Sequence, residues 1–284
     1  MNSSAKPLVH VVVGPTASGK TTRAIELALQ WNTEVINADA RQVYKEMNIG
    51  VARPFPHEIE AVPHHLIAHR SIHLDYSAAA YAVEAKPLLD SLLQSHGSAV
   101  LVGGSGLYIQ ALLEGLDNLP TTPPEVRTHF QTIFEQEGLI SLQQRVAAKD
   151  PVYFAQVDSQ NPRRLLRALE VMEVSGKPYT EHLTKMKKKE SLYPVLYHRL
   201  QPDREELNQR IASRVRHMME QGLEAEVRTL YPFKHLNALK TVGYREFFDA
   251  WDGLHPSDTI EKRMIDHTRQ YARRQETWFK KYAL

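Results

Sequence analysis

The 284 residues, 42% of them hydrophobic and 24% charged, are enough for one large α/β domain or for a core with a smaller subdomain. The absence of Cys excludes disulfides and Cys-based zinc sites and indicates an intracellular setting, and no apolar run reaches the roughly 18 residues that a membrane span needs. Because the first residues also lack the apolar region of a signal peptide, the expected compartment is the cytoplasm. We expect a monomer that has no membrane contact and needs no protein partner.

The first predicted elements surround a phosphate-binding motif. Residues 8–13 are β-branched and apolar apart from one His, which predicts a strand buried on both faces of a parallel sheet. Residues 14–21, GPTASGKT, fit the G-x-x-x-x-G-K-[ST] phosphate loop at every defined position, and residues 22–31 have the apolar spacing of a helix. This order of strand, loop and helix is the one in which the motif binds phosphate.

The chemistry of this loop predicts an anion site. Gly14 and Gly19 allow the backbone to turn its N–H groups inward, the helix N-terminus adds positive potential, and Lys20 adds a full charge. The Thr21 hydroxyl is a ligand for Mg²⁺, the cofactor that we expect here. We therefore predict that a di- or triphosphate group is bound by Gly14, Pro15, Thr16, Ala17, Ser18, Gly19, Lys20 and Thr21.

A carboxylate follows the second predicted strand, residues 34–38. Ligands of an open parallel sheet bind beyond the carboxyl ends of its strands, so Asp39 is expected on the same rim as the phosphate loop. Residues 40–44 (ARQVY) are rich in groups that hydrogen-bond to a base or stack on it. Residues 50–63 contain three prolines and are predicted to form a loop that covers the site.

Four histidines follow this loop: His64, His65, His69 and His73. Their spacing includes i, i+4 pairs, which is one arrangement of metal ligands. Because no carboxylate pair or Cys accompanies them, we assign no metal site to this segment.

The third predicted strand ends unlike that of an ATPase. After a predicted helix at residues 77–95, the strand at 99–102 continues into GGSGLY. Nucleoside-triphosphate hydrolases usually place an Asp after such a strand to hold Mg²⁺. The glycines and Ser105 therefore argue against ATP hydrolysis and for another use of the phosphate loop.

The pattern changes after residue 117. Residues 119–124 (LPTTPP) are a predicted linker, and residues 125–183 show helical periodicity with almost no strand signal. We therefore expect an α/β fold in which residues 1–117 and 191–284 form a P-loop NTPase-like parallel-sheet core flanked by helices, with an all-helical subdomain inserted at 118–190. The insertion carries Arg127, Arg163, Arg164 and Arg167.

The chain returns to a strand pattern at residues 193–200. Asp203 is expected to cap a helix that continues to Gln221. Arg210 and Arg214 share one face of it and can reach one anionic group together. Residues 241–246 (TVGYRE) are predicted as a turn into another helix, and a last helix is expected at 257–281.

Basic residues concentrate in two places. Residues 261–284 contain seven Lys or Arg against three acids, and residues 185–189 contain four lysines. An isolated charged run is usually a solvated surface, but two such runs beside a phosphate site indicate a polyanionic partner such as RNA.

Over nearly its whole length, the chain resembles the bacterial tRNA dimethylallyltransferases, also called tRNA isopentenyltransferases. The resemblance rests on the phosphate loop and on further segments: INADARQVY, VPHHLI, LVGGSGLY, RRLLRALEV, RIASRV, GLEAEV, VGYRE and TRQYARRQETWF. A phosphate-loop kinase would share only the loop itself. Ala40 stands where the family usually has Ser, and Ser105 stands where it usually has Thr, a change that keeps the hydroxyl.

This resemblance implies a prenyl transfer. The phosphate loop would hold dimethylallyl diphosphate with Mg²⁺. The N6 amine of adenosine 37, 3′-adjacent to the anticodon in tRNAs that read codons beginning with U, would attack its allylic carbon. Asp39 would orient the amine and take its proton, Ser105 would help to bind substrate, and Arg214 would lie near the diphosphate. These three are the implied catalytic residues.

The implied partners are dimethylallyl diphosphate and the anticodon stem-loop of tRNA. Because the target base must leave its stack to reach a buried diphosphate, we expect a channel between the entrances of the two substrates. The implied tRNA-binding residues are Asp39, Ala40, Arg41, Gln42, Ser105, Arg127, Arg163, Arg164, Leu165, Leu166, Arg167, Lys240, Gly243, Tyr244 and Arg245.

Three other functions remain open at this point. One is a cytokinin-type isopentenyltransferase that acts on AMP, ADP or ATP, although a mononucleotide needs no basic helical insertion. Another is a small-molecule phosphate-loop kinase, for which Asp39 would also serve as a base. A non-catalytic RNA-binding module requires neither an intact phosphate loop nor a carboxylate beside it.

Overall fold

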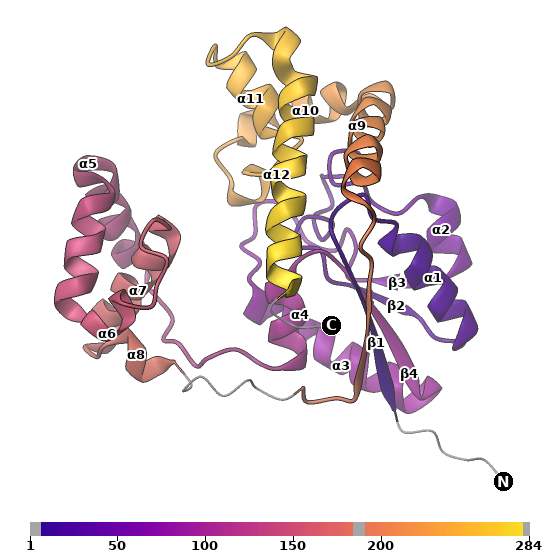
Figure 1. Ribbon diagram of the computed structural model, residues 1–284, viewed down its shortest axis with the longest axis horizontal. Helices are drawn as coiled ribbons and strands as arrows, with labels where there is room; N and C mark the ends of the chain where they lie inside the picture. The colour runs from indigo at the N-terminus through magenta and orange to yellow at the C-terminus, as the bar shows by residue number, and fades with distance from the viewer. Residues whose placement is uncertain (1–6, 184–190, 281–284) are drawn as a thin grey trace. The chain divides into compact units, whose positions relative to one another are not determined.

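The computed structural model describes residues 7–183 and 191–280. The chain divides into two compact units, Met1–Gly115 with Glu190–Leu284, and Leu116–Lys189 (Figure 1). We call the first the core unit and the second the helical unit, and each is described by itself. The basic residues at 185–189 and Lys281 lie outside the described residues.

A five-stranded parallel sheet forms the centre of the core unit. Its strands are β1 (Leu8–Val13), β2 (Val35–Asn37), β3 (His64–His65), β4 (Ser98–Val102) and β5 (Val195–Arg199), in the order β3-β2-β4-β1-β5. In the register of the central strands, Val11 lies opposite Leu101 on one side and Tyr197 on the other. The predicted α/β fold with a parallel sheet is confirmed, and the carboxyl ends of the strands share one edge.

Helices cover both faces of this sheet. Val9, Val11 and Val13 pack in one cluster with α3 (Ala78–His96) and α4 (Gly106–Leu113), while Val12 packs in another with α1 (Lys20–Gln30). Side chains of a strand alternate between its faces, so the unbroken apolar run of β1 supplies both layers.

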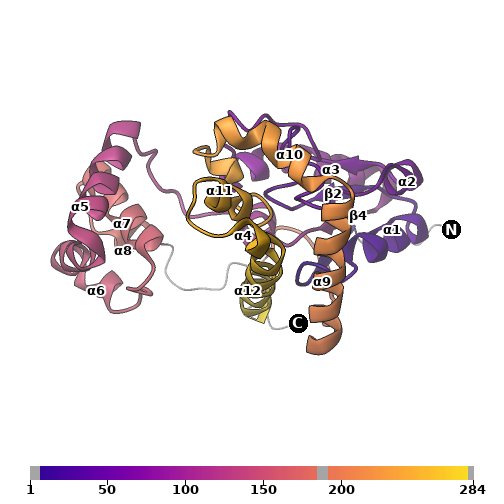
Figure 2. The same cartoon turned by 90° about the horizontal axis from the view of Figure 1, so that it is seen from above.

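The second half of the core unit is helical. It contains α9 (Arg204–Glu220), α10 (Leu223–Leu230), α11 (Arg245–Trp251) and α12 (Ile260–Lys280), with short 3₁₀ turns at Tyr231–Phe233, Asn237–Leu239 and Ser257–Thr259. The Asp203 carboxylate accepts a hydrogen bond from the Glu205 amide at 2.8 Å and caps α9 as predicted. Helix α9 runs alongside α12 (Figures 1 and 2). Buried residues of α10, α11 and α12 share a core with Val43, Tyr44 and Met47.

The helical unit contains α5 (Pro124–Lys149), α6 (Pro151–Phe154), α7 (Pro162–Ser175) and α8 (Tyr179–His182). Helix α5 is broken at Gly138, whose φ of 76° and ψ of −171° are not helical. Phe130, Leu142 and Leu165 belong to the buried core of this unit. The Asp150 carboxylate joins α6 to α8, since it accepts hydrogen bonds from the Tyr153 amide and the Thr180 amide and hydroxyl.

Part of the predicted covering loop at residues 50–63 is helical, which corrects the sequence reading. Helix α2 (Pro56–Ala61) begins at a proline, and the Glu58 carboxylate accepts a hydrogen bond from the Phe55 amide at 2.8 Å. The prolines that suggested an irregular loop therefore include one at a favourable helix start. Across residues 7–183 and 191–280, no helix is both long and apolar enough to cross a membrane.

Candidate active site

The phosphate loop joins β1 to α1. Gly19 precedes α1 with a left-handed φ of 87°, a conformation that glycine adopts without strain. The Lys20 ammonium donates a hydrogen bond to the Pro15 carbonyl at 2.6 Å, which folds this side chain back over the loop. The loop therefore presents its backbone and Lys20 together beside the start of a helix, where an anion is stabilised.

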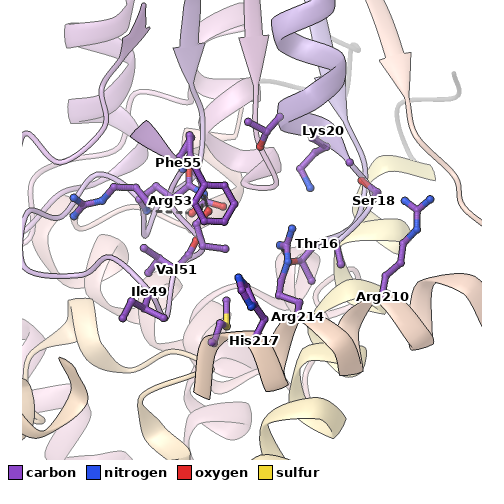
Figure 3. A pocket seen from close by; sticks show the side chains of 18 of the residues that line it. Thr16, Ser18, Lys20, Ile49, Val51, Arg53, Phe55, Arg210, Arg214 and His217 are labelled. Carbon is purple, nitrogen blue, oxygen red and sulfur yellow. Dashed lines mark hydrogen bonds between the residues drawn. The ribbon is translucent and has the colours of Figure 1, made fainter. Parts of the chain in front are cut away.

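Residues 16–22 form one wall of a cavity of about 780 Å³, which we call the first cavity. Thr16, Ser18 and Lys20 lie on one side of it, and Ile49, Val51 and Phe55 lie on the other (Figure 3). Arg210 and Arg214 line it from α9, so the i, i+4 spacing on that helix brings two guanidinium groups to the phosphate loop. The cavity thus combines a cationic wall with a largely apolar one.

Lys20 and Arg214 lie in a desolvated part of this cavity. Burial lowers the pKa of Lys20 to about 8, with the negative charge of Asp39 opposing this shift and the positive charge of Arg214 adding to it. Burial likewise lowers the pKa of Arg214, against the charges of Glu58 and Asp39. The Arg214 guanidinium donates to the Thr16 hydroxyl at 3.4 Å. An incoming polyanion would relieve the repulsion between these two cations.

Asp39 lines the first cavity and lies two residues beyond the end of β2. Its carboxylate accepts hydrogen bonds from the amides of Arg41 at 2.8 Å and Gln42 at 3.4 Å, which close a tight turn. The Ser105 hydroxyl accepts a hydrogen bond from the Ala40 amide at 2.9 Å. Ser105 lines neither of the two cavities described here, so it holds the turn that carries Asp39.

A second cavity of about 90 Å³ lies next to the first. Both are lined by Asp39, Arg214 and Tyr271. The second cavity is also bordered by Arg41 and by residues 241–243. Asp39 therefore stands where a cavity walled by the phosphate loop and a smaller cavity adjoin.

The last helix reaches this site through Gln275, which sequence reasoning missed. The Gln275 amide accepts a hydrogen bond from the Thr16 amide at 2.8 Å and donates one to the Gly104 carbonyl at 3.1 Å. A Cβ on Gly104 would lie 2.1 Å from the Gln275 amide nitrogen, so the glycine permits this approach. Tyr271, Gln275 and Trp278 recur at i, i+4 and i+7, a spacing that marks the inward face of the basic helix.

The expected tRNA-binding residues of the core unit differ in their exposure. Lys240 and Arg245 are exposed, whereas Arg41 and Gly243 line the second cavity. Tyr244 corrects the expectation: it is fully buried and its hydroxyl donates to Glu226 at 2.6 Å, so its side chain is not at a surface. Gln42, which was also expected to contact tRNA, uses its side-chain amide within the protein. It donates hydrogen bonds to the carbonyls of Val51 and Ala52.

In the helical unit, three of the expected arginines are exposed: Arg127, Arg163 and Arg164. Arg167 instead donates to the Thr122 hydroxyl at 2.6 Å and to the Pro120 carbonyl at 3.4 Å, which ties α7 to the preceding linker. Leu165 is fully buried in the core of the unit, and Leu166 packs partly against it. The Leu165 side chain therefore stabilises α7 and is not exposed for contact with RNA, which corrects the expectation for this residue.

Among the described residues, no group of three or more His, Cys, Asp or Glu side chains is arranged to hold a metal ion. Of the histidines that were not assigned to a metal, His65 pairs with Glu34 at 2.5 Å and His69 with Glu84 at 3.1 Å. Thr21 lines the first cavity. A Mg²⁺ ion beside Thr21 would need its further oxygen ligands from a bound phosphate and water, a form of binding that Mg²⁺ commonly adopts.

Comparison with known proteins identifies relatives of this chain. The family model described as IPP transferase matches residues 42–282. The tRNA dimethylallyltransferase of Christiangramia forsetii is 44% identical over 270 residues, 95% of this chain and 89% of that protein. The tRNA dimethylallyltransferase 1 of Bacteroides thetaiotaomicron is 41% identical over 277 residues, 97% of this chain and 89% of that protein.

Solved structures show the same fold. The tRNA isopentenylpyrophosphate transferase of Bacillus halodurans superimposes with a TM-score of 0.70 at 32% identity, covering 97% of this chain and 87% of that one. A eukaryotic dimethylallyltransferase acting on tRNA superimposes with a TM-score of 0.80 at 27% identity, covering 96% of this chain and 70% of that one.

Proposed function

We infer that this chain, which belongs to the IPP transferase family, is a tRNA dimethylallyltransferase. It transfers a dimethylallyl group from dimethylallyl diphosphate to the N6 amine of adenosine 37, next to the anticodon of tRNA, and releases diphosphate. The observation that carries this inference is the position of Asp39. One carboxylate borders both a cavity walled by the phosphate loop and a second cavity beside it.

The chemistry follows from this position. The C–O bond between the allylic carbon and the diphosphate breaks, and a C–N bond forms between that carbon and N6. An aryl amine is a weak nucleophile, and the Asp39 carboxylate orients it and accepts the proton that it loses. Lys20, Arg210 and Arg214 stabilise the negative charge that gathers on the leaving diphosphate. Ser105 acts indirectly on the reaction, because its hydroxyl accepts the hydrogen bond that fixes the turn carrying Asp39.

We propose Mg²⁺ as the cofactor, with the Thr21 hydroxyl as its protein ligand. The lining of the first cavity fits this assignment, since Thr21 faces the space where the diphosphate would lie. When bound, the ion would neutralise part of the diphosphate charge and make it a better leaving group.

We propose that tRNA, in the cytoplasm, is bound by both units of a monomer. Arg41, Lys240 and Arg245 would contact it from the core unit, and Arg127, Arg163 and Arg164 from the helical unit, together with the basic part of α12. Arginine and lysine contacts to phosphate position the RNA and carry little sequence information. The adenosine would enter through the second cavity, and tRNAs that read codons beginning with U are the proposed substrates.

The direct test is transfer of radiolabelled dimethylallyl from its diphosphate, with Mg²⁺, to an unmodified anticodon stem-loop, with AMP and ATP as competing acceptors. Label on the RNA alone is the expected result. Label on a mononucleotide would instead identify a cytokinin-type enzyme. If no label were transferred, a kinase that uses ATP as donor would become the better reading.

Neutralising Arg163 and Arg164 together is expected to weaken tRNA binding. Each lost phosphate contact should reduce the slope of log K against log salt by roughly 0.7 to 0.9, because fewer counterions are released. Binding of the anticodon stem-loop to Arg163→Gln/Arg164→Gln, measured across a salt series, checks this. The KM for dimethylallyl diphosphate should stay unchanged.

The matched control is Arg145→Gln. This arginine also belongs to the helical unit, but its guanidinium is paired with Glu137 at 3.1 Å. Equal loss of affinity in the control, or unchanged affinity and salt slope in the double variant, would remove these two arginines from the RNA interface.

A further inference from the structure

One short segment forms walls of both cavities. Residues 48, 49 and 51–55 line the first cavity, and residues 50–52 line the second. We call residues 48–55 the wall loop. Its side chains Ile49, Val51 and Phe55 face the phosphate loop across the first cavity (Figure 3). The position of this loop therefore sets the width of the space that receives the donor.

A single carboxylate on α10 binds the start of the wall loop. Glu226 accepts hydrogen bonds from three consecutive amides, those of Asn48 at 3.2 Å, Ile49 at 2.7 Å and Gly50 at 3.1 Å. Consecutive amides that converge on one anion fix the backbone direction at all three residues. Because the acceptor is ionised, these bonds are stronger than those to a neutral group.

A buried tyrosine orients this carboxylate. The Tyr244 hydroxyl donates to Glu226 at 2.6 Å, and burial, followed by the charge of Glu226, raises the pKa of this hydroxyl. The phenol therefore remains a neutral donor. The ring packs so closely against Gly50 that a Cβ there would lie 2.6 Å from it. Glu226 thus fixes the start of the wall loop by hydrogen bonds, and the Tyr244 ring fixes it by packing against Gly50.

The second half of the wall loop is held by hydrogen bonds to residues that are close to it in the sequence. The Arg53 guanidinium donates to the carbonyls of Tyr44, Lys45 and Met47. Gln42 donates to the carbonyls of Val51 and Ala52, which holds Ala52 at a left-handed φ of 49°. These contacts join residues at most ten positions apart. Glu226 differs because it ties the loop to a helix more than 170 positions away.

We propose that Glu226 is a positioning residue of the transferase, which holds the wall loop at the distance from the phosphate loop that the donor requires. This proposal rests on the proposed function for its kinetic consequence. Glu226 touches no reacting atom in it, and acts through the backbone of residues 48–50.

The proposal predicts a separation of KM from kcat. Without the Glu226 carboxylate the wall loop samples open positions. The apparent donor affinity is then the intrinsic affinity multiplied by the fraction of molecules in which the loop is closed. Saturating donor closes the loop again, so the chemical step recovers. We expect Glu226→Gln to raise the KM for dimethylallyl diphosphate by about tenfold, with kcat within about threefold of the wild type.

Amide hydrogen exchange gives a readout that needs no turnover. The amides of residues 48–50 should exchange at least about tenfold faster in Glu226→Gln, because their acceptor has lost its charge. Tyr244→Phe, which removes only the hydroxyl donor, should change both the exchange and the KM in the same direction by less. Glu224→Gln is the matched control, since Glu224 lies two residues earlier on α10 and pairs with Arg228 at 2.6 Å.

The exchange and kinetic measurements distinguish a positioning role of Glu226 from a merely structural one. Faster exchange at residues 48–50 together with a raised KM, absent from the Glu224 control, supports the positioning role. A fall in kcat with unchanged KM would indicate a merely structural role and overturn the proposal, as would unchanged exchange. If the wild-type chain itself transfers no dimethylallyl group, the proposed function fails, and the exchange comparison still decides whether Glu226 holds the loop.

Discussion

Asp39→Asn is expected to lower kcat by about 10²- to 10⁴-fold, the usual contribution of a positioned general base. Asparagine keeps an oxygen in place of the one that accepts hydrogen bonds from the amides of Arg41 and Gln42, so the turn after β2 should persist. It loses the basic carboxylate that takes the proton from N6. Single-turnover transfer of label to an anticodon stem-loop measures this effect.

Two further measurements separate chemistry from folding and from binding. The affinity for the stem-loop should remain within about twofold of the wild type, because most of it comes from phosphate contacts elsewhere. Asp39→Ala should lose turnover to the same extent and also lose about 1 kcal/mol of stability, because the turn amides lose their acceptor. Full turnover by the asparagine variant would show that another group accepts the proton.

Lys20→Met is expected to raise the KM for dimethylallyl diphosphate by roughly 10- to 100-fold, the loss that a charge-assisted hydrogen bond to the diphosphate represents. Methionine keeps the length of the side chain and removes its charge. The affinity for the stem-loop should not change. Initial rates across donor concentrations check this, and a variant with wild-type KM would show that the diphosphate does not meet Lys20.

The same residue predicts a pH dependence. Because the pKa of Lys20 in the free protein is lowered to about 8, the ammonium loses its proton as the pH rises through 8. The donor KM of the wild type should therefore rise above pH 8, by up to about tenfold per pH unit, while that of Lys20→Met should not. Donor binding near pH 8 to 9 should also take up a proton, detectable by calorimetry in buffers of different ionisation enthalpy.

The linked effect on stability has a defined sign. In the unfolded chain Lys20 has its ordinary pKa of 10.5, above its value in the folded state. Between pH 8 and 10.5 the unfolded state therefore binds more protons, and the contribution of this residue to the free energy of unfolding rises with pH. The difference in melting temperature between wild type and Lys20→Met should shift in favour of the wild type across that window.

Several features of this protein were determined by the sequence by itself. The phosphate loop is one contiguous segment whose function depends on its own backbone, so local spacing was enough to predict it. The apolar run of β1 predicted a strand with two buried faces, and the sheet confirms it. Family resemblance supplied the reaction, because many separate segments match one class of enzyme.

Only the tertiary structure decided which polar groups meet. Thr16 and Gln275 are 259 positions apart, and Gly50 and Glu226 are 176 apart, so no local pattern relates them. A sequence shows that an arginine is basic, but its partner determines whether it is free for RNA, as Arg167 illustrates. Hydrogen bonds and burial act between groups that folding brings within about 3 Å, and that proximity is a property of the packed chain.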